Sequence, residues 1–433
     1  MRQRMHSSAI PLFLMGLFSE TQIRIVAFMD ITELVCYIAG PILFLQDLPK
    51  LKKHGFGTFL LVWFLCAVGC CLSSLYNHTA LPFFLRGFGV PVAVFCLACV
   101  FHHFLSRDFA SFKWFFLGVA LSNVLSLFVF QRGTSRMVGG EDLAGEEAFE
   151  NAVGYSLFWL VQLTTWLSLP IKMRYLKTPK IYVVGYVLFT MVYGLLSAGS
   201  RSTFGVSFLV LLLVLNGGKQ SKTMDFLKKH FWTIALAGML ALPVIMWGYK
   251  TAALSGVLGD VSLKKYQEQS ARGSGLMPML MSGRAGFFIG IDAALDRPIM
   301  GFGPWAVDEF GYLQRYTEKY GSADAIKVLN ENLALGRLGL IPSHSFVVNF
   351  WLWYGIFGLI CMLYTGWLYF KTLKDRLSCI PELYGYFALA LPTVLWAWLF
   401  SPFGHRTSAT FLMVLCLFAK AVAEKRFIVE PKI

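Results

Sequence analysis

Long apolar runs recur along most of this chain, and they constrain its fold more than any other feature. A run of roughly 17 to 25 apolar residues is long enough to cross a bilayer as a helix. The composition agrees, because 57% of the 433 residues are hydrophobic and the mean hydropathy is +0.61. A soluble domain of this size has one core to fill and needs fewer apolar residues. We therefore expect an all-α polytopic membrane protein.

Hydropathy predicts about twelve membrane spans. The first two are the least regular, because Glu20, Arg24 and Asp30 lie around their junction. No small-residue cleavage site follows the first run, so we expect it to remain as an uncleaved anchor. The predicted spans cover residues 9–28, 31–47, 57–76, 84–105, 110–130, 153–171, 181–197, 201–216, 230–249, 344–369, 382–400 and 407–423.

Basic residues between the spans indicate how the chain is oriented. Cytoplasmic loops of membrane proteins are enriched in lysine and arginine. With the N-terminus in the cytoplasm, every loop on that side is basic, as at Lys50, Lys52 and Lys53, whereas the opposite loops are nearly uncharged or mixed. The formal net charge of +14 is thus spread over thin inner loops, which argues against a nucleic-acid-binding surface.

This orientation divides the chain into three parts. Residues 1–249 hold nine spans, residues 250–343 form one large outer loop, and residues 344–433 hold three more spans and a cytoplasmic tail. A loop this long in a compact protein is usually functional.

Part of the outer loop, "SGRAGFFIGIDAALDRPIMGFGPW", has the pattern of an amphipathic helix followed by a turn. We expect a cap at Ser282 and an apolar stripe of Phe288, Ile291 and Leu295. Such a helix can lie along the membrane surface with this stripe either in lipid or against the spans. In the "GFGP" that follows, glycines supply the backbone freedom of a tight turn.

Three outer-side residues each stand at the start of a predicted helix: Arg201, Arg284 and His344. Backbone N–H groups and the helix dipole favour an anion there. Two guanidinium groups suit a phosphate or diphosphate, and a histidine suits proton transfer. The structural alternatives stay open, because interfacial arginines anchor lipid headgroups and a histidine can cap a helix.

Other polar residues carry weaker signals. Arg86 lies inside a predicted span, where an ionisable residue is a functional candidate, but it is near enough to the outer end to snorkel. His405 and Arg406, in the last outer turn, are equally ambiguous. The nine cysteines show no disulfide framework, and we interpret the pairs His102–His103 and Cys96/Cys99 as structural.

Two glycines follow His344 in "PSHSFVVNFWLWYGIFGL". On a continuous helix, Gly355 lies within about 20° of His344 and Gly358 within about 40°, at depths of about 16 and 21 Å. A smooth face below a polar residue admits either a closely packed helix or a lipid tail.

These segments resemble the bacterial O-antigen ligases. "HSFVVNFWLWYGIFG" matches the pattern H-[NSQ]-x9-G-x-x-G, although Leu359 replaces the small or hydroxyl residue that often follows. "SAGSRSTFG" resembles the Ser-Arg start of a span in that family, and the outer-loop helix with its Gly-x-Gly turn resembles the family's loop segment. The motif-bearing part runs from about Ser197 to Leu359.

The resemblance implies a fold similar to C-type membrane glycosyltransferases, with a large periplasmic loop that contains helices. The donor would be a glycan on undecaprenyl diphosphate, bound by Arg201 and Arg284, with Arg86 as a further candidate. His344 would be the general base, and Ser345, Gly355 and Gly358 would contribute to substrate binding. The resemblance implies no metal, nucleotide or other cofactor.

The acceptor distinguishes the open functional alternatives. A ligase transfers the glycan to lipid A-core at the periplasmic face of the inner membrane, and the large loop and histidine motif favour it. A polymerase transfers it to another carrier-linked repeat by the same chemistry. A transporter of a lipid-linked substrate is the alternative from another class, and it predicts internal repeats and broken helices.

Overall fold

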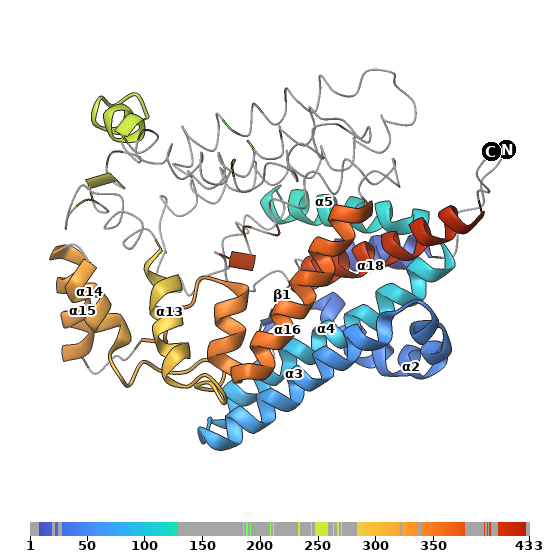
Figure 1. Cartoon of the computed structure of the whole chain (residues 1–433), viewed down its shortest axis with the longest axis horizontal. Helices are drawn as coiled ribbons and strands as arrows, with labels where there is room; N and C mark the ends of the chain where they lie inside the picture. The colour runs from blue at the N-terminus through green and yellow to red at the C-terminus, as the bar shows by residue number, and fades with distance from the viewer. Residues whose placement is uncertain are drawn as a thin grey trace.

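The computed structural model of the chain describes residues 8–19, 22–24, 28–128, 247–258, 284–320, 323–335, 339–376 and 406–429, with scattered positions at 185–244, 263–270 and 394–399. This part of the chain is mainly α-helical (Figure 1). Its β structure is a small antiparallel pair of strands, β1 (Gln22–Arg24) and β2 (Phe28–Asp30). The all-α expectation is thus confirmed for the described residues only as a mainly helical fold, because the β1–β2 pair was not expected.

Four described helices are long and apolar enough to cross a membrane, which supports the prediction of a membrane protein. The predicted spans from 153 to 249 and over 382–400 lie outside the described residues except for scattered positions, so the count of twelve stays a prediction. The four helices are α2 (Ile31–Lys53), α3 (Phe56–Tyr76), α4 (Leu81–Arg107) and α16 (Phe346–Arg376).

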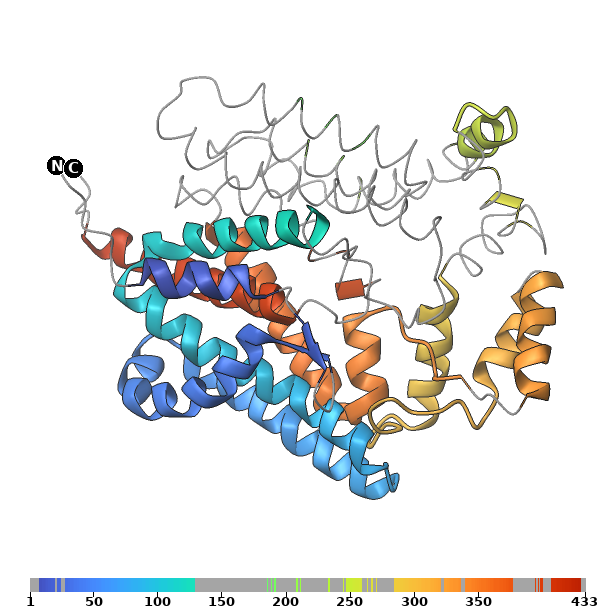
Figure 2. The ribbon, with the colours of Figure 1, turned by 180° about the vertical axis from the view of Figure 1, so that it is seen from behind.

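These helices pack around a shared aromatic and aliphatic core. Fully buried Trp63 on α3 meets Phe350 on α16 edge to face, with ring centroids 5.7 Å apart. The helices α5 (Phe112–Phe128), which follows the 3-10 turn η1 (Phe109–Ser111), and α18 (Arg406–Val429) extend this core. Figure 2 shows α3 and α4 running side by side in front of part of α16.

The first predicted span is wrong as a single helix. Helix α1 (Ala9–Leu17) has nine residues, a rise of about 14 Å, which is less than half of a roughly 30 Å hydrocarbon core. The β1–β2 pair follows it, and pairing between the strands satisfies backbone groups that a helix would satisfy internally. Instead, α1 packs on α5, where a Cβ at Gly16 would overlap the carbonyl oxygen of Phe115.

A polar cluster joins the end of α2 to α4. Nδ1 of His103 lies 2.5 Å from Oδ2 of Asp47, and Nζ of Lys50 lies 2.9 Å from its Oδ1. Nδ1 of His54 lies 3.1 Å from Nε2 of His102. Within the described ranges, no group of three or more His, Cys, Asp or Glu side chains is placed to hold a metal ion. The contacts join α2 and its C-cap to α4, and the structural interpretation of the histidine pair stays a prediction.

In the described residues from 284 to the start of α16, the chain forms α13 (Ala285–Asp296), α14 (Tyr312–Tyr320) and α15 (Ala323–Ala334). The N-cap of α13 is Arg284. The buried side of this helix carries Ile289 and Ala293, whereas Leu295 is exposed. The predicted stripe of Phe288, Ile291 and Leu295 is thus the less buried side of α13, and its contact with lipid stays a prediction. The cap is Arg284 and not the predicted Ser282. The small residues of this helix allow its opposite side to pack closely on the protein.

Helix α16 is broken at Gly355, whose φ of 59° and ψ of −143° lie outside the helical region. Phe350 and Gly358 would be separated by about 12 Å of rise in an unbroken helix. Here a Cβ at Gly358 would overlap the carbonyl oxygen of Phe350, so the chain turns sharply. Figure 1 shows the two parts of α16 meeting at an angle. The expected continuous face from His344 to Gly358 is wrong, because glycine readily adopts the positive φ that ends the helix.

The turn that follows α13 closes this break. The amide of Ile356 donates to the carbonyl of Ile299 at 3.0 Å, and the amide of Phe302 donates to the carbonyl of Leu352 at 2.7 Å. These bonds satisfy backbone groups that the break removes from the helical ladder. Gly301, with φ 68°, permits the approach, because a Cβ there would lie 2.6 Å from the Leu352 carbonyl oxygen.

The side chain of Asn77, the C-cap of α3, holds the same turn together with Arg297. Nη1 of Arg297 donates to Oδ1 of Asn77 at 2.6 Å, and Nδ2 of Asn77 donates to the carbonyl of Gly301 at 3.1 Å. The guanidinium of Arg297 also lies 4.6 Å from the centroid of the Phe302 ring. The turn therefore bridges α13, α3 and the broken α16.

Candidate functional site

Helix α13 and the first part of α16 lie side by side and run in the same direction. A Cβ at Gly286 would overlap His344, and a Cβ at Gly290 would lie 2.7 Å from Cγ1 of Val348. Both contacts advance along the two segments together, so the helix starts lie at the same end (Figures 1 and 2). Two dipoles thus present their positive ends to one place, where the first N–H groups of each helix lack helical partners.

His344 and Arg284 meet at this place. Arg284 is the N-cap of α13, and the imidazole of His344 rests on Gly286 in its first turn. His344 has an exposed edge, yet the surrounding atoms displace enough water to lower its pKa from the ordinary 6.5, and the positive charge of Arg284 lowers it further. The imidazole is therefore neutral at neutral pH, with a free pair of electrons available to accept a proton.

Two tryptophans from a third segment border the site. The guanidinium of Arg284 lies 4.6 Å from the centroid of the Trp396 ring, a cation–π distance. Oγ of Ser345 donates to the carbonyl of Trp398 at 3.0 Å and accepts from the amide of Val348 at 3.3 Å. Sequence reasoning missed both tryptophans. The signal was "LWAWLF" at the end of a predicted span, but it is equally typical of an interfacial aromatic belt.

Ser343 and Asn349 form a polar pair beside the histidine. Oγ of Ser343 donates to Oδ1 of Asn349, which is 6% exposed and lies in the first part of α16. Sequence reasoning also missed this pair, because a single asparagine inside an apolar helix carries no motif.

The segment that leads to His344 is held by strand-like pairing. The amide of Asp308 donates to the carbonyl of Gly339 at 2.9 Å, and the amide of Ile341 donates to the carbonyl of Ala306 at 3.0 Å. The carboxylate of Asp308 caps α14 by accepting a hydrogen bond from the backbone amide of Tyr312 at 2.9 Å. These contacts fix the approach to the site before the helix begins.

The other predicted site residues have separate surroundings. Ser345 is buried and caps α16, and Gly355 and Gly358 are covered by the protein's own backbone, so the structure gives all three a packing role. Their predicted part in substrate binding stays a prediction.

Arg86 lies on α4 next to Gly87, whose carbonyl accepts from the hydroxyl of Tyr354 at 2.8 Å. Arg86 is thus one residue from the contact between α4 and the end of the first part of α16. Arg201 and His405 lie outside the described residues, and the side chain of Arg406 does as well.

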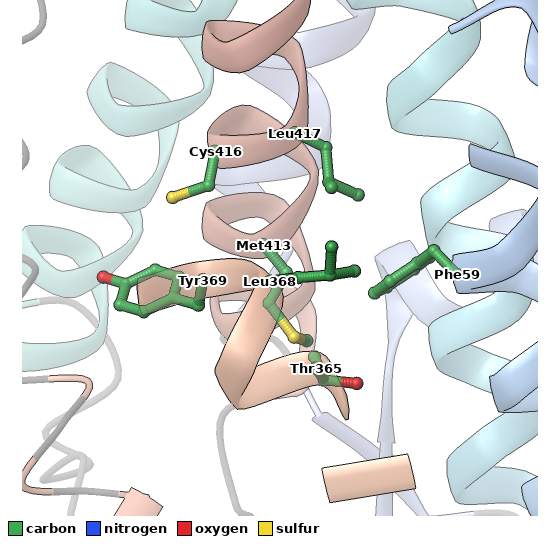
Figure 3. A pocket seen from close by; sticks show the side chains of 7 residues that line it. All are labelled: Phe59, Thr365, Leu368, Tyr369, Met413, Cys416 and Leu417. Atoms are coloured by element: carbon green, nitrogen blue, oxygen red, sulfur yellow. The ribbon is translucent and has the colours of Figure 1, made fainter. Parts of the chain in front are cut away.

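A small cavity lies between α3, α18 and the second part of α16, about 20 residues along the chain from His344. It measures about 10 Å³, close to the least that admits one water molecule. Figure 3 shows Leu368 and Phe59 facing each other across it, while the hydroxyl of Tyr369 points away. Its size and its mostly apolar walls exclude it as a site for a large polar substrate.

The described site can therefore bind an anion and accept a proton within one small region. Arg284 and two helix N-termini supply the positive potential, and His344 supplies the base. Comparison with protein-family models, with curated proteins and with solved structures finds no match to this chain.

Proposed function

We propose that this protein is a membrane glycosyltransferase that moves a glycan from a polyprenyl diphosphate to an acceptor hydroxyl. The observation that carries the proposal is the meeting of His344 with Arg284 where α13 and α16 begin side by side. A guanidinium and two helix N-termini favour a diphosphate. A neutral imidazole next to them is suited to general base catalysis.

In the proposed reaction, the acceptor hydroxyl oxygen attacks the anomeric carbon of the donor sugar. A carbon–oxygen bond forms there, and the bond from that carbon to the diphosphate oxygen breaks. Undecaprenyl diphosphate leaves with the electron pair, and His344 takes the hydroxyl proton. Arg284 stabilises the charge that develops on the leaving group, with Arg201 and Arg86 as further donor-binding residues. The glycosyl–diphosphate bond supplies the driving force, so no nucleotide is needed.

Within this reaction class we propose an O-antigen ligase that acts at the periplasmic face of the bacterial inner membrane, with lipid A-core as acceptor. The resemblance of the segments around Arg201, Arg284 and His344 to that family supports the choice. Deletion of the gene followed by a lipopolysaccharide gel tests it. Loss of all capped core is expected, whereas core capped with a single repeat would identify a polymerase.

The broken α16 also fits a transporter, because transporters use discontinuous helices at their binding sites. In transporters the freed backbone groups face the substrate. Here the amide of Ile356 and the carbonyl of Leu352 are paired with the turn after α13. The break therefore anchors an adjacent segment, and we keep the glycosyltransferase as the proposal.

The proposal is tested with purified protein in liposomes that contain a carrier-linked donor and an acceptor glycan. His344→Ala is expected to lower transfer by about 100-fold or more, the usual contribution of a general base. His78→Asn is the matched control, because His78 is exposed between α3 and α4 and asparagine tolerates its φ of 50°. Full transfer by His344→Ala would overturn the proposed mechanism.

Metal independence is tested in the same assay. A preformed guanidinium at the diphosphate does the work that a divalent cation does in other glycosyltransferases. Transfer is expected to survive a chelator, and restoration of chelator-sensitive transfer by added Mg²⁺ or Mn²⁺ would contradict the proposal.

A further inference from the structure

Asn349 combines deep burial with unused hydrogen-bonding capacity. Only 6% of the residue is exposed, and its Oδ1 accepts from Oγ of Ser343. Its Nδ2 makes no hydrogen bond within the described part of the chain, yet it is not among the atoms sealed from solvent there. Whichever way the amide is turned, one end has no hydrogen-bond partner among the described residues.

An unpaired amide in so buried a residue costs free energy unless a ligand or water completes its hydrogen bonds. Ser343 precedes His344 directly, so the carboxamide is hydrogen-bonded to the residue before the proposed base. The substrate that must come to His344 is the acceptor, whose hydroxyl gives up its proton. A neutral amide does not attract a diphosphate by charge, whereas it donates well to sugar hydroxyl, ring or acetamido oxygens.

We propose that Asn349 binds an oxygen of the acceptor sugar beside His344, and that Ser343 positions the carboxamide for this contact. The inference rests on the proposed function and adds a residue that recognises the acceptor. Arg284 and the helix N-termini then serve the donor, and the Ser343–Asn349 pair serves the acceptor.

The experiment measures KM for each substrate and kcat in the liposome transfer assay, with donor and acceptor varied separately. The variants are Asn349→Ala, Asn349→Asp and Ser343→Ala, with Asn330→Ala on the exposed side of α15 as the matched control. Asn349→Ala is expected to raise the acceptor KM about 10-fold, the upper effect of one neutral hydrogen bond.

The other variants follow from the same contact. Asn349→Asp is expected to raise the acceptor KM further, because it keeps the shape but replaces two N–H donors by an acceptor. Ser343→Ala is expected to raise it less, because the amide stays in place but loses its orientation. kcat and the donor KM should change less than about twofold, because the hydrogen bond is retained from bound substrate to transition state.

Four results would overturn the inference. An unchanged acceptor KM in Asn349→Asp, with His344→Ala inactive, would reject Asn349 as a ligand and leave the proposed function standing. A rise in the donor KM alone would assign Asn349 to the donor and not to the acceptor. Lower yield of folded protein without a change in either KM would make Asn349 structural. Absence of transfer by the wild type would overturn the proposed function and this inference together.

Discussion

The imidazole of His344 occupies the space that a side chain at Gly286 would need. A Cβ at Gly286 would overlap Nδ1 of His344 and lie 2.9 Å from its Cε1. The first turn of α13 therefore approaches the histidine as closely as a helix can, because this position has no side chain.

Gly286→Ala is expected to displace the imidazole and to lower glycan transfer by at least 10-fold, because a misplaced base loses its geometry with the substrate. Overpacking is expected to lower the free energy of unfolding by about 1–3 kcal/mol. Transfer assays and thermal unfolding measure the two effects. Gly57→Ala, where a Cβ meets nothing within 4 Å, should leave both unchanged or stabilise the helix slightly. Normal transfer by Gly286→Ala would show that the imidazole has room to move.

The pH dependence of transfer should report His344. Its pKa is lowered, first by burial and then by Arg284, so the acid limb of kcat/KM is expected to have its midpoint below pH 6.5. In Arg284→Gln the limb should move up towards 6.5, because a positive charge is removed. Arg315→Gln, an exposed arginine on α14, should leave the midpoint in place. An identical acid limb in Arg284→Gln would show that the charge of Arg284 does not lower the pKa of His344.

Stability should follow pH with a defined sign. The unfolded chain binds a proton at His344 near pH 6.5, whereas the folded protein binds it at a lower pH. The unfolded state thus holds more protons between those two values, so stability rises with pH across that window and is lower below it. His344→Gln should flatten this part of the profile in thermal unfolding measured against pH, and an unchanged slope would contradict the lowered pKa.

Gly355→Ala should be among the most destabilising single changes in the described part of the chain. Its φ of 59° is unfavourable for alanine, and a Cβ would overlap the carbonyl oxygen of Ile299. We expect a loss of about 3 kcal/mol or more in the free energy of unfolding. Gly339→Ala, with Leu313 Cδ2 3.9 Å away, is the control and should change stability little. Thermal unfolding in detergent compares them, and equal stability would show that the break has an alternative geometry.

Arg297→Gln should loosen the turn that closes the break. It removes a charge-assisted hydrogen bond to Asn77 and the cation–π contact with Phe302, together about 1–3 kcal/mol. Hydrogen exchange of the amide of Phe302 should quicken, whereas exchange in α15 should not. Equal protection of Phe302 in the variant would mean that the backbone bonds alone hold the turn.

Hydropathy is sufficient to predict the helices α2, α3, α4 and α16, because a bilayer requires long apolar helices with internally paired backbones. It mispredicts α1, where the hairpin interrupts the run near Glu20 and Arg24. Local propensity is an incomplete guide at such a junction, because strand pairing supplies the hydrogen bonds that the expected helix would have made.

The positions of Arg284 and His344 at helix starts are readable from the sequence, but their contact is not. The contact depends on the small residues at Gly286 and Gly290, spaced one turn apart, which let α13 and α16 approach. That spacing is visible in "AGFFIGI", and it was the one sequence signal of close packing between these two helices. The break at Gly355 was not predictable from the glycine alone, because its hydrogen-bond partners come from a distant part of the chain.

The closure of the α16 break also bears on how this protein can be engineered. The segment after α13 completes the backbone pairing of a membrane helix through Ile299 and Phe302, so it is not a removable module. A chimera that exchanges only the segment between the spans would leave Leu352 and Ile356 without their partners. An exchange should therefore include the turn after α13, the part of α16 around Gly355, and Asn77, so that the recipient keeps the hydrogen bonds between them.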